Sequence, residues 1–155
     1  MGADSARVRP ACAADLADVV RLVSEHAAYE KAAAPPADLA ERLRTLLFGT
    51  QPPRLRCVVA ESHDSEIIGY ATYVPEVSTW DGAEYLHMDC LFLREGHRGL
   101  KVGPLLVEAV IAEARELGLT QIQWQTPPWN TGAIKFYGRL GAHAKEKLRY
   151  HLSVD

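Results

Sequence analysis

A long apolar strand that runs through a short basic turn into the clearest helix of the chain constrains the fold most. Residues 83–93, AEYLHMDCLFL, end in a continuously apolar stretch, as expected for a central, buried strand. Residues 103–118, GPLLVEAVIAEARELG, repeat apolar residues at helical spacing and close with Gly118. The turn between them carries Arg98 and Lys101. This succession predicts a sheet with helices packed on it.

The other elements alternate around this unit. Turn signals and periodicity predict strands at 6–12, 55–62, 67–77, 120–126 and 143–154, with helices at 13–29, 38–48 and 131–141. The polar turn HDSE makes the strands at 55–62 and 67–77 a hairpin. The order β-α-α-β-β-β-α-β-α-β predicts an α/β (α+β) fold with a mixed, mostly antiparallel central sheet flanked by helices. We expect residues 1–155 to form a single domain, because there is no internal repeat or linker.

Composition narrows the class of protein. The chain is 48% hydrophobic and 24% charged with a net charge of −3, which is ordinary for a soluble domain and gives no basic footprint for nucleic acid. No apolar run is long enough to cross a bilayer, and the first residues lack a signal sequence. We therefore expect a cytoplasmic protein with no nucleic-acid or membrane partner.

The cysteines and histidines do not suggest a metal site. Cys12, Cys57 and Cys90 are odd in number and far apart, and the six histidines have no HxxxH spacing. We expect reduced thiols and no metal.

The turn before the long helix has the chemistry of an anion site. The backbone N–H groups of a helix's first turn lack internal partners, and the helix dipole adds positive charge there. Gly99 and Gly103 let the backbone approach a bulky anion, and Arg98 and Lys101 add full charges. The same residues also fit a plain strand-to-helix turn with exposed cations.

Asp89 is the polar residue of the apolar strand that most needs an explanation, since burying an unpaired carboxylate is costly. It could bind a cationic substrate or take a proton from an ammonium group through water. His87 shares its face by strand alternation and is an alternative base. A solvated Asp89 paired with a nearby cation is the simpler alternative.

Two motifs resemble those of the GNAT N-acetyltransferase superfamily. In the first, R/Q-x-x-G-x-G/A, Arg98 and Gly103 match the first and last positions, while Lys101 replaces the first glycine. The second, N-x-x-A-x-x-F-Y-x-x-x-G, is similar to WNTGAIKFYGRLGA at 129–142. Within the superfamily, AAYEKAA, LLFG, STWDGAEYLHMDCLFL and PPWN most resemble the diamine (spermidine/spermine) N-acetyltransferases.

The resemblance implies a set of roles. Acetyl-CoA would be the cosubstrate, with backbone groups of the late strand pairing with its pantetheine arm and the turn holding its pyrophosphate. The implied cofactor-binding residues are Leu91, Phe92, Leu93, Arg98, Gly99, Leu100, Lys101, Val102, Gly103, Asn130 and Ala133. Tyr137 would be the general acid, because a phenol can protonate a departing thiolate. It could instead be an aromatic packed on Phe136.

The acceptor implied is a small primary amine, polyamine- or diamine-like. Tyr29 and Glu30 would bind it through charge and cation–π attraction, although they also fit a solvated helix end. The same cleft could be lined by His87, Asp89, Trp80, Gln123, Trp124 and Gln125. Because neighbouring residues of a strand point to opposite faces, only some of Gln123, Trp124 and Gln125 can face it.

The implied reaction is direct attack of the amine on the thioester in a ternary complex. The alternatives are another small amine (an amino acid, a lysine analogue or an aminated antibiotic) or a catalytically weak acyl-CoA-binding domain. The altered positions Lys101 and Pro104 motivate the last one. The resemblance also implies a homodimer.

Overall fold

The computed structural model describes residues 6–98 and 101–155 and forms two compact units. The first unit ends at Gln125 and contains a sheet with its covering helices; the second begins at Thr126 and contains one helix and the C-terminal segment. The interpretation of residues 1–155 as one domain stays a prediction. None of the helices in the described ranges is both long and apolar enough to span a membrane.

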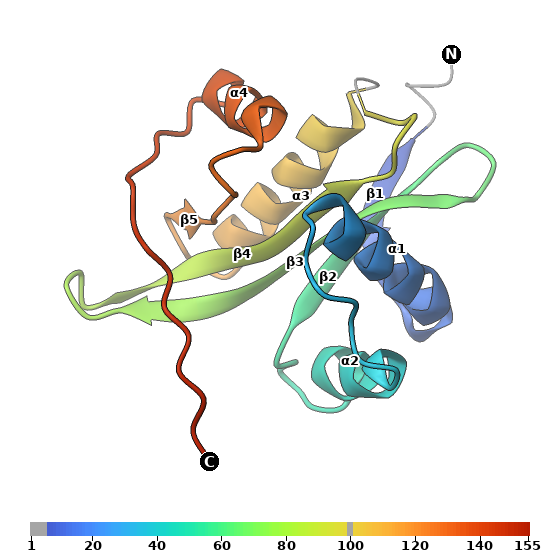
Figure 1. Cartoon of the computed structure of the whole chain (residues 1–155), viewed down its shortest axis with the longest axis horizontal. Coiled ribbons are helices and arrows are strands. Elements are labelled where there is room, and N and C mark those ends of the chain that lie inside the picture. The colour runs from blue at the N-terminus through green and yellow to red at the C-terminus, as the bar shows by residue number, and fades with distance from the viewer. Residues whose placement is uncertain (1–5, 99–100) are drawn as a thin grey trace. The chain divides into compact units, whose positions relative to one another are not determined.

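The sheet of the first unit has five strands in the order in which they occur along the chain (Figure 1). They are β1 (Arg7–Pro10), β2 (Arg56–Glu61), β3 (Ile67–Ser78), β4 (Ala83–Leu93) and β5 (Ile122–Gln123). The first four pair antiparallel, and β5 runs parallel to β4. A mixed, mostly antiparallel sheet is what the sequence predicts, so the fold class is confirmed.

The helices also begin and end close to the predicted positions. They are the 3₁₀ turn η2 (Ala13–Asp15), α1 (Leu16–Tyr29), α2 (Leu39–Phe48), α3 (Val102–Glu116) and, in the second unit, α4 (Thr131–Arg139). After α3 the backbone turns at Gly118, where φ is 74°. A side chain is disfavoured at this left-handed φ, which is why the glycine marks the end of the helix.

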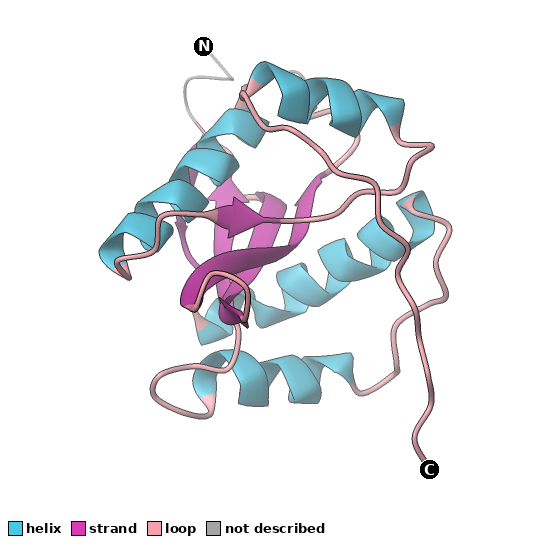
Figure 2. Cartoon of the chain, turned by 90° about the vertical axis from the view of Figure 1, so that its left-hand side faces the viewer, coloured by secondary structure: helices cyan, strands magenta, loops and turns pink. Residues whose placement is uncertain are grey.

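Two apolar clusters cover the two faces of the sheet. Alternate residues of β2 point to opposite faces, so Val58 and Ala60 pack under α3, whereas Cys57 and Val59 pack under α1 and α2. Figure 2 shows the strands in magenta between helices on both sides. The alternation in β4 follows the same rule, with Leu86 facing α3.

A β-bulge interrupts this alternation in the middle of β4. Thr72 of β3 pairs with Cys90, and the next residue, Tyr73, pairs with Met88, so Asp89 has no partner in the register. Met88 packs on the α3 side and Cys90 against the cluster under α1. Because Asp89 is the extra residue, Asp89 and Cys90 both lie on the α1 side of the sheet.

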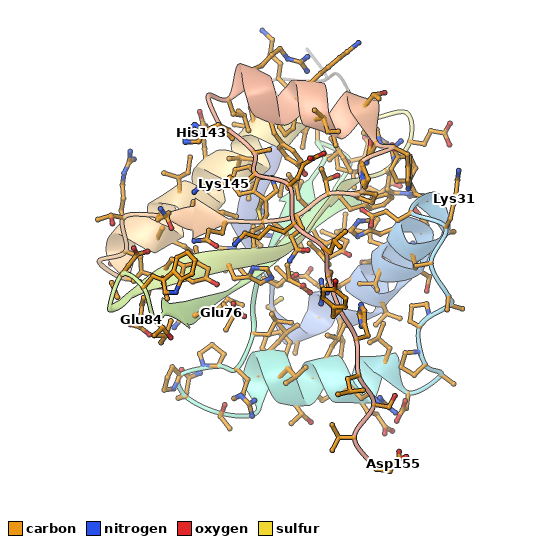
Figure 3. The ribbon with its side chains drawn as sticks, turned by 60° about the vertical axis from the view of Figure 1, so that its left-hand side comes forward. Lys31, Glu76, Glu84, His143, Lys145 and Asp155 are labelled. Atoms are coloured by element: carbon orange, nitrogen blue, oxygen red, sulfur yellow. The ribbon has the colours of Figure 1, made fainter. Side chains whose placement is uncertain are left out.

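The predicted last strand is wrong. Residues 142–155 form no strand, and the alternating apolar side chains of this segment are exposed: Leu148, Tyr150, Leu152 and Val154. Figure 3 shows the segment extended, with His143 and Lys145 after α4 and Asp155 at its end. Alternation alone does not make a strand, because a strand also needs a neighbour for its backbone hydrogen bonds.

Candidate functional site

The central carboxylate of the candidate site lies where β4 and β5 part. The ladder between these strands joins Leu86 to Ile122 and His87 to Gln123, and includes no later described residue of β4. Just beyond its end, the bulge presents Asp89 with a side chain that is 54% exposed. His87 Nε2 lies 3.7 Å from Asp89 Oδ1, so the structure brings the two candidate bases together.

The side chains of β5 and of the two residues that follow it divide between the two faces of the sheet. Ile122 and Trp124 pack against the cluster under α3, which places Trp124 away from His87 and Asp89. Gln123 is the register partner of His87, so its side chain is on the α1 face, where it donates from Nε2 to Gln121 Oε1 at 2.7 Å. Gln125 follows at strand spacing and is exposed.

A partly buried thiol lies next to the exposed carboxylate. Cys90 Sγ is 3.7 Å from Asp89 Oδ2. Burial, and then the negative charge of Asp89, raise the pKa of Cys90 to about 11. Burial likewise raises the pKa of the Cys57 thiol to about 12. Both thiols therefore stay protonated near neutral pH, and neither is activated as a nucleophile.

The end of β4 leads into the turn that the sequence predicts as the pyrophosphate site. Leu91 and Leu93 pack against the α3 cluster, and Phe92 packs under α1. Arg98 Nε donates to the carbonyl oxygen of Leu93 at 2.9 Å, so the arginine lies back against the end of the strand. Gly99 and Leu100, also expected to bind the cofactor, lie outside the described residues.

The start of α3 has the properties of an anion site. Lys101 is the N-cap residue, with φ 64° and ψ 13°, and its side chain makes no capping hydrogen bond. Val102 is buried in the core, so only its backbone could contact a ligand, as could that of Gly103. Free N–H groups at a helix N-terminus attract phosphate, and Pro104 lacks an N–H group where helices tolerate its absence.

Tyr29 ends α1 with its ring centroid 6.3 Å from that of Phe92 in β4, and Glu30 follows it. The guanidinium carbon of Arg98 lies 4.3 Å from the ring centroid of Tyr29. Glu30 Oε2 lies 3.1 Å from His26 Nε2, and the ring of His26 stacks on Phe92 with centroids 4.9 Å apart. These two predicted amine-binding residues thus lie beside the predicted cofactor turn.

Trp80 is not gathered with the other predicted residues. It lies in the turn between β3 and β4, and its side chain is 96% exposed.

In the second unit, Asn130 caps α4. Its Oδ1 accepts a hydrogen bond from the Ala133 N–H group at 3.2 Å. Tyr137 is half-buried on this helix, and its ring centroid is 5.4 Å from that of Phe136. Its role as the general acid stays a prediction.

The described residues include no group of three or more His, Cys, Asp or Glu side chains placed to hold a metal ion. The arrangement therefore offers two chemical resources in the first unit. One is an exposed carboxylate beside an imidazole, and the other is a cationic turn at a helix N-terminus. Together they suit a cationic or amine substrate next to a phosphate-bearing one.

Sequence reasoning missed two features of this site. One is the bulge at Asp89, which no local pattern signals because Asp89 and Cys90 sit in an otherwise regular strand. The other is the contact of His26 with Tyr70, whose hydroxyl lies 2.8 Å from His26 Nδ1. These residues are far apart in the chain, so only the packing of α1 on β3 reveals the pair.

Comparison with known proteins identifies the family. Residues 20–142 match the sequence model described as "Acetyltransferase (GNAT) family". The chain is similar to thialysine N-epsilon-acetyltransferase from Mus musculus, with 30% identity over 145 residues that cover 89% of this chain and 84% of the mouse protein. It is also similar to L-ornithine N5-acetyltransferase NATA1 from Arabidopsis thaliana, with 28% identity over 98 residues, or 63% of this chain and 43% of the plant protein.

The fold is shared with solved structures as well. A possible acetyltransferase from Clostridium difficile 630 superposes with a TM-score of 0.79 and 14% identity, covering 97% of this chain and 98% of that one. The match to the family begins within α1 and extends over α2, strands β2 to β5, α3 and α4. The chain therefore belongs to the GNAT family and is an acetyltransferase.

Proposed function

We propose that this acetyltransferase moves the acetyl group of acetyl-CoA to the terminal primary amine of a small aliphatic molecule, either a diamine or polyamine or a lysine analogue. The observation that carries the proposal is Asp89, which the bulge presents to solvent beside His87 where β4 and β5 part. A carboxylate here attracts an alkylammonium group and can receive its proton through water. The net charge of −3 also slightly favours a cationic substrate.

The names of the two relatives bear on the acceptor. Thialysine Nε and ornithine N5 are both primary amines at the end of a short side chain. A diamine offers the same terminal group without the amino-acid carboxylate. The two classes can therefore use one amine subsite and differ in what holds the other end of the molecule.

In the proposed reaction, the ammonium group loses a proton with help from Asp89 or His87. The neutral nitrogen then forms a bond to the thioester carbonyl carbon, and the carbon–sulfur bond breaks as the tetrahedral intermediate collapses. Tyr137 donates its phenolic proton to the CoA thiolate that leaves, and the proton that the attacking nitrogen loses on becoming an amide returns through water to restore the phenol. Aligning the two reactants supplies much of the rate, with effective molarities of about 10^5 M or more.

Direct transfer is favoured over an acetyl-cysteine intermediate. The one thiol next to Asp89, that of Cys90, has a pKa raised to about 11 by burial and the nearby carboxylate. Initial-rate measurements with both substrates varied should give intersecting double-reciprocal lines, and Cys90→Ala should keep kcat close to that of the wild type. Parallel lines with an inactive Cys90→Ala would contradict direct transfer.

A panel of acceptors tests the substrate class. Release of the CoA thiol should be measured with spermidine, short diamines, thialysine, ornithine, other amino acids and an aminoglycoside. We expect kcat/KM to be highest for diamines, polyamines or lysine analogues, and Asp89→Asn to lower it about 10^2-fold for the best of them. Preference for the aminoglycoside or for an α-amine, or full activity of Asp89→Asn, would contradict the proposal.

A further inference from the structure

Arg98 lies on an aromatic seat formed by Tyr29 and Phe92. Its guanidinium carbon is 4.3 Å from the ring centroid of Tyr29 and 5.4 Å from that of Phe92. The two rings are 6.3 Å apart and tilted by 54°, so the guanidinium meets both faces. Both distances lie within the range of cation–π attraction. With the hydrogen bond from Nε to Leu93, the arginine is held at three points.

The seat is anchored in the core. Phe92 is 6% exposed and stacks on His26 at an interplanar angle of 19°. His26 in turn lies within hydrogen-bond distance of the buried hydroxyl of Tyr70, at 2.8 Å, and of Glu30, at 3.1 Å. Burial raises the pKa of Tyr70, so its hydroxyl keeps its proton. Because His26 is fixed by these hydrogen-bond partners and Phe92 is packed against it, the ring of Phe92 is held in position.

Among the described residues, nothing occupies the Nη donors that Arg98 would offer to an anion. Nε donates a hydrogen bond to the Leu93 carbonyl oxygen, and the Nη groups make no hydrogen bond to any residue of the described ranges. A guanidinium that is already fixed loses less conformational freedom when it binds phosphate than one on a free side chain. The seat therefore favours binding of a phosphate-bearing ligand without touching it.

The same geometry bears on the role of Tyr29. One face of its ring already carries the positive charge of Arg98. An ammonium group approaching that face would be repelled by a like charge at close range. Glu30, whose carboxylate is 34% exposed, has no such conflict with a cation.

We propose that Tyr29 and Phe92 are positioning residues that hold Arg98 ready for the pyrophosphate of acetyl-CoA, and that Tyr29 acts on the cofactor rather than on the amine. The proposal rests on the proposed function, because it takes the pyrophosphate of acetyl-CoA as the anion. The family resemblance implies that Tyr29 binds the amine, whereas this proposal assigns it to acetyl-CoA binding.

Substitution of Tyr29 tests this directly. The ring is 41% exposed at a helix end, so Tyr29→Leu should fold. We expect Tyr29→Leu to weaken acetyl-CoA binding about 3- to 20-fold in calorimetry and to raise KM for acetyl-CoA in parallel. KM for the amine should not change. Tyr29→Phe keeps the ring face and should bind acetyl-CoA within about twofold of the wild type.

Three controls separate positioning from a general structural role. Tyr85→Leu removes another ring of the same unit, whose hydroxyl donates to Glu76 at 3.0 Å, and should leave acetyl-CoA affinity unchanged. With S-acetyl-pantetheine, which lacks the pyrophosphate, Tyr29→Leu should react as well as the wild type. In an Arg98→Ala background, Tyr29→Leu should cause no further loss of acetyl-CoA affinity.

The outcomes divide clearly. Wild-type affinity of Tyr29→Leu for acetyl-CoA would overturn the positioning role, as would a rise in KM for the amine alone or an equal loss with S-acetyl-pantetheine. In each of these cases the wild type still binds acetyl-CoA, and the proposed function stands. Failure of the wild type to bind acetyl-CoA would instead overturn the proposed function and this assignment with it.

Discussion

At the scale of single residues, the best-defined interaction is the ion pair between Arg9 and Asp15. Arg9 Nη1 and Nη2 donate to the two oxygens of Asp15 at 2.8 and 2.9 Å, and the Cys12 N–H group donates to Asp15 Oδ2 at 2.8 Å. The Asp15 side chain is only 8% exposed. These contacts tie β1 to the start of α1.

The pair should make stability depend on pH. The hydrogen bonds from Arg9, opposed by burial, lower the pKa of Asp15 to about 2. Because the pKa of this carboxyl is lower in the folded state than in the unfolded state, its ionised form stabilises the folded protein. The full stabilisation is present above the unfolded-state pKa, near 4, and it is lost as the pH falls from about 4 to 2. We expect Asp15→Asn to lower the free energy of unfolding by about 2 kcal/mol at pH 7.

Urea unfolding at several pH values measures this effect. The difference between the wild type and Asp15→Asn should shrink as the pH falls through that window. A difference that is absent at pH 7, or that does not change between pH 5 and 2, would mean that the ion pair does not contribute as described.

Tyr137 gives the second residue-scale prediction. If its phenol protonates the leaving thiolate, Tyr137→Phe should lower kcat about 10^2-fold or more while acetyl-CoA affinity stays near that of the wild type. The ring and its packing on Phe136 are kept, so α4 should be unaffected. Steady-state rates and calorimetry on the same preparation separate the two effects. Full kcat in Tyr137→Phe would show that another group donates the proton.

At the scale of elements, the sequence predicts most of the architecture. Apolar periodicity places α1, α2 and α3, and β4 has the predicted bounds, because these elements bury a regular face against the sheet. The sequence pattern overestimates the length of β5, which comprises only two residues. It also misses the bulge, because an extra residue in a ladder depends on the partner strand β3 and not on β4 alone.

The junction between β4 and α3 contains a strained backbone conformation at Lys101. Lys101 takes a left-handed conformation, with φ 64°, at a position where the family motif has glycine. A residue with a Cβ is strained there by about 1 kcal/mol, whereas glycine is not. The sequence alone shows the substitution, and the structure shows that the backbone keeps the glycine-like conformation.

Lys101→Gly should therefore raise the free energy of unfolding by up to about 1 kcal/mol, while the matched variant Lys101→Ala should not. Both variants lose a cation next to the start of α3, so both should bind acetyl-CoA more weakly than the wild type. Thermal unfolding and calorimetry measure the two quantities. Tighter acetyl-CoA binding by Lys101→Gly would show that the lysine hinders the site.

At the scale of the whole molecule, the two units differ in how far the sequence predicts them. The first unit has the strand order and the helices that chain order and periodicity predict, whereas the bulge in β4 was not predicted. In the second unit helix α4 lies where the sequence predicts a helix, whereas the alternating segment after it forms no strand. Long-range pairing is what a single sequence determines least, since it depends on residues far away in the chain.

The site follows the same division. Residues of one strand, such as His87 and Asp89, were predicted together because alternation relates them. The seat of Arg98 could not be predicted, because Tyr29, Phe92 and the turn come from three separate segments. Their contact joins the end of α1 to the turn that is predicted to hold the pyrophosphate.

The measurement that tests the account most directly is product analysis of the complete reaction. The protein should be incubated with acetyl-CoA and the best amine of the panel, and the acetylated amine and the free CoA thiol should be quantified together by mass spectrometry and thiol titration. We predict one N-acetylated terminal amine for each CoA released, and no release beyond slow hydrolysis without amine. Release of thiol without acetylated amine, or no release with any primary amine, would contradict the account.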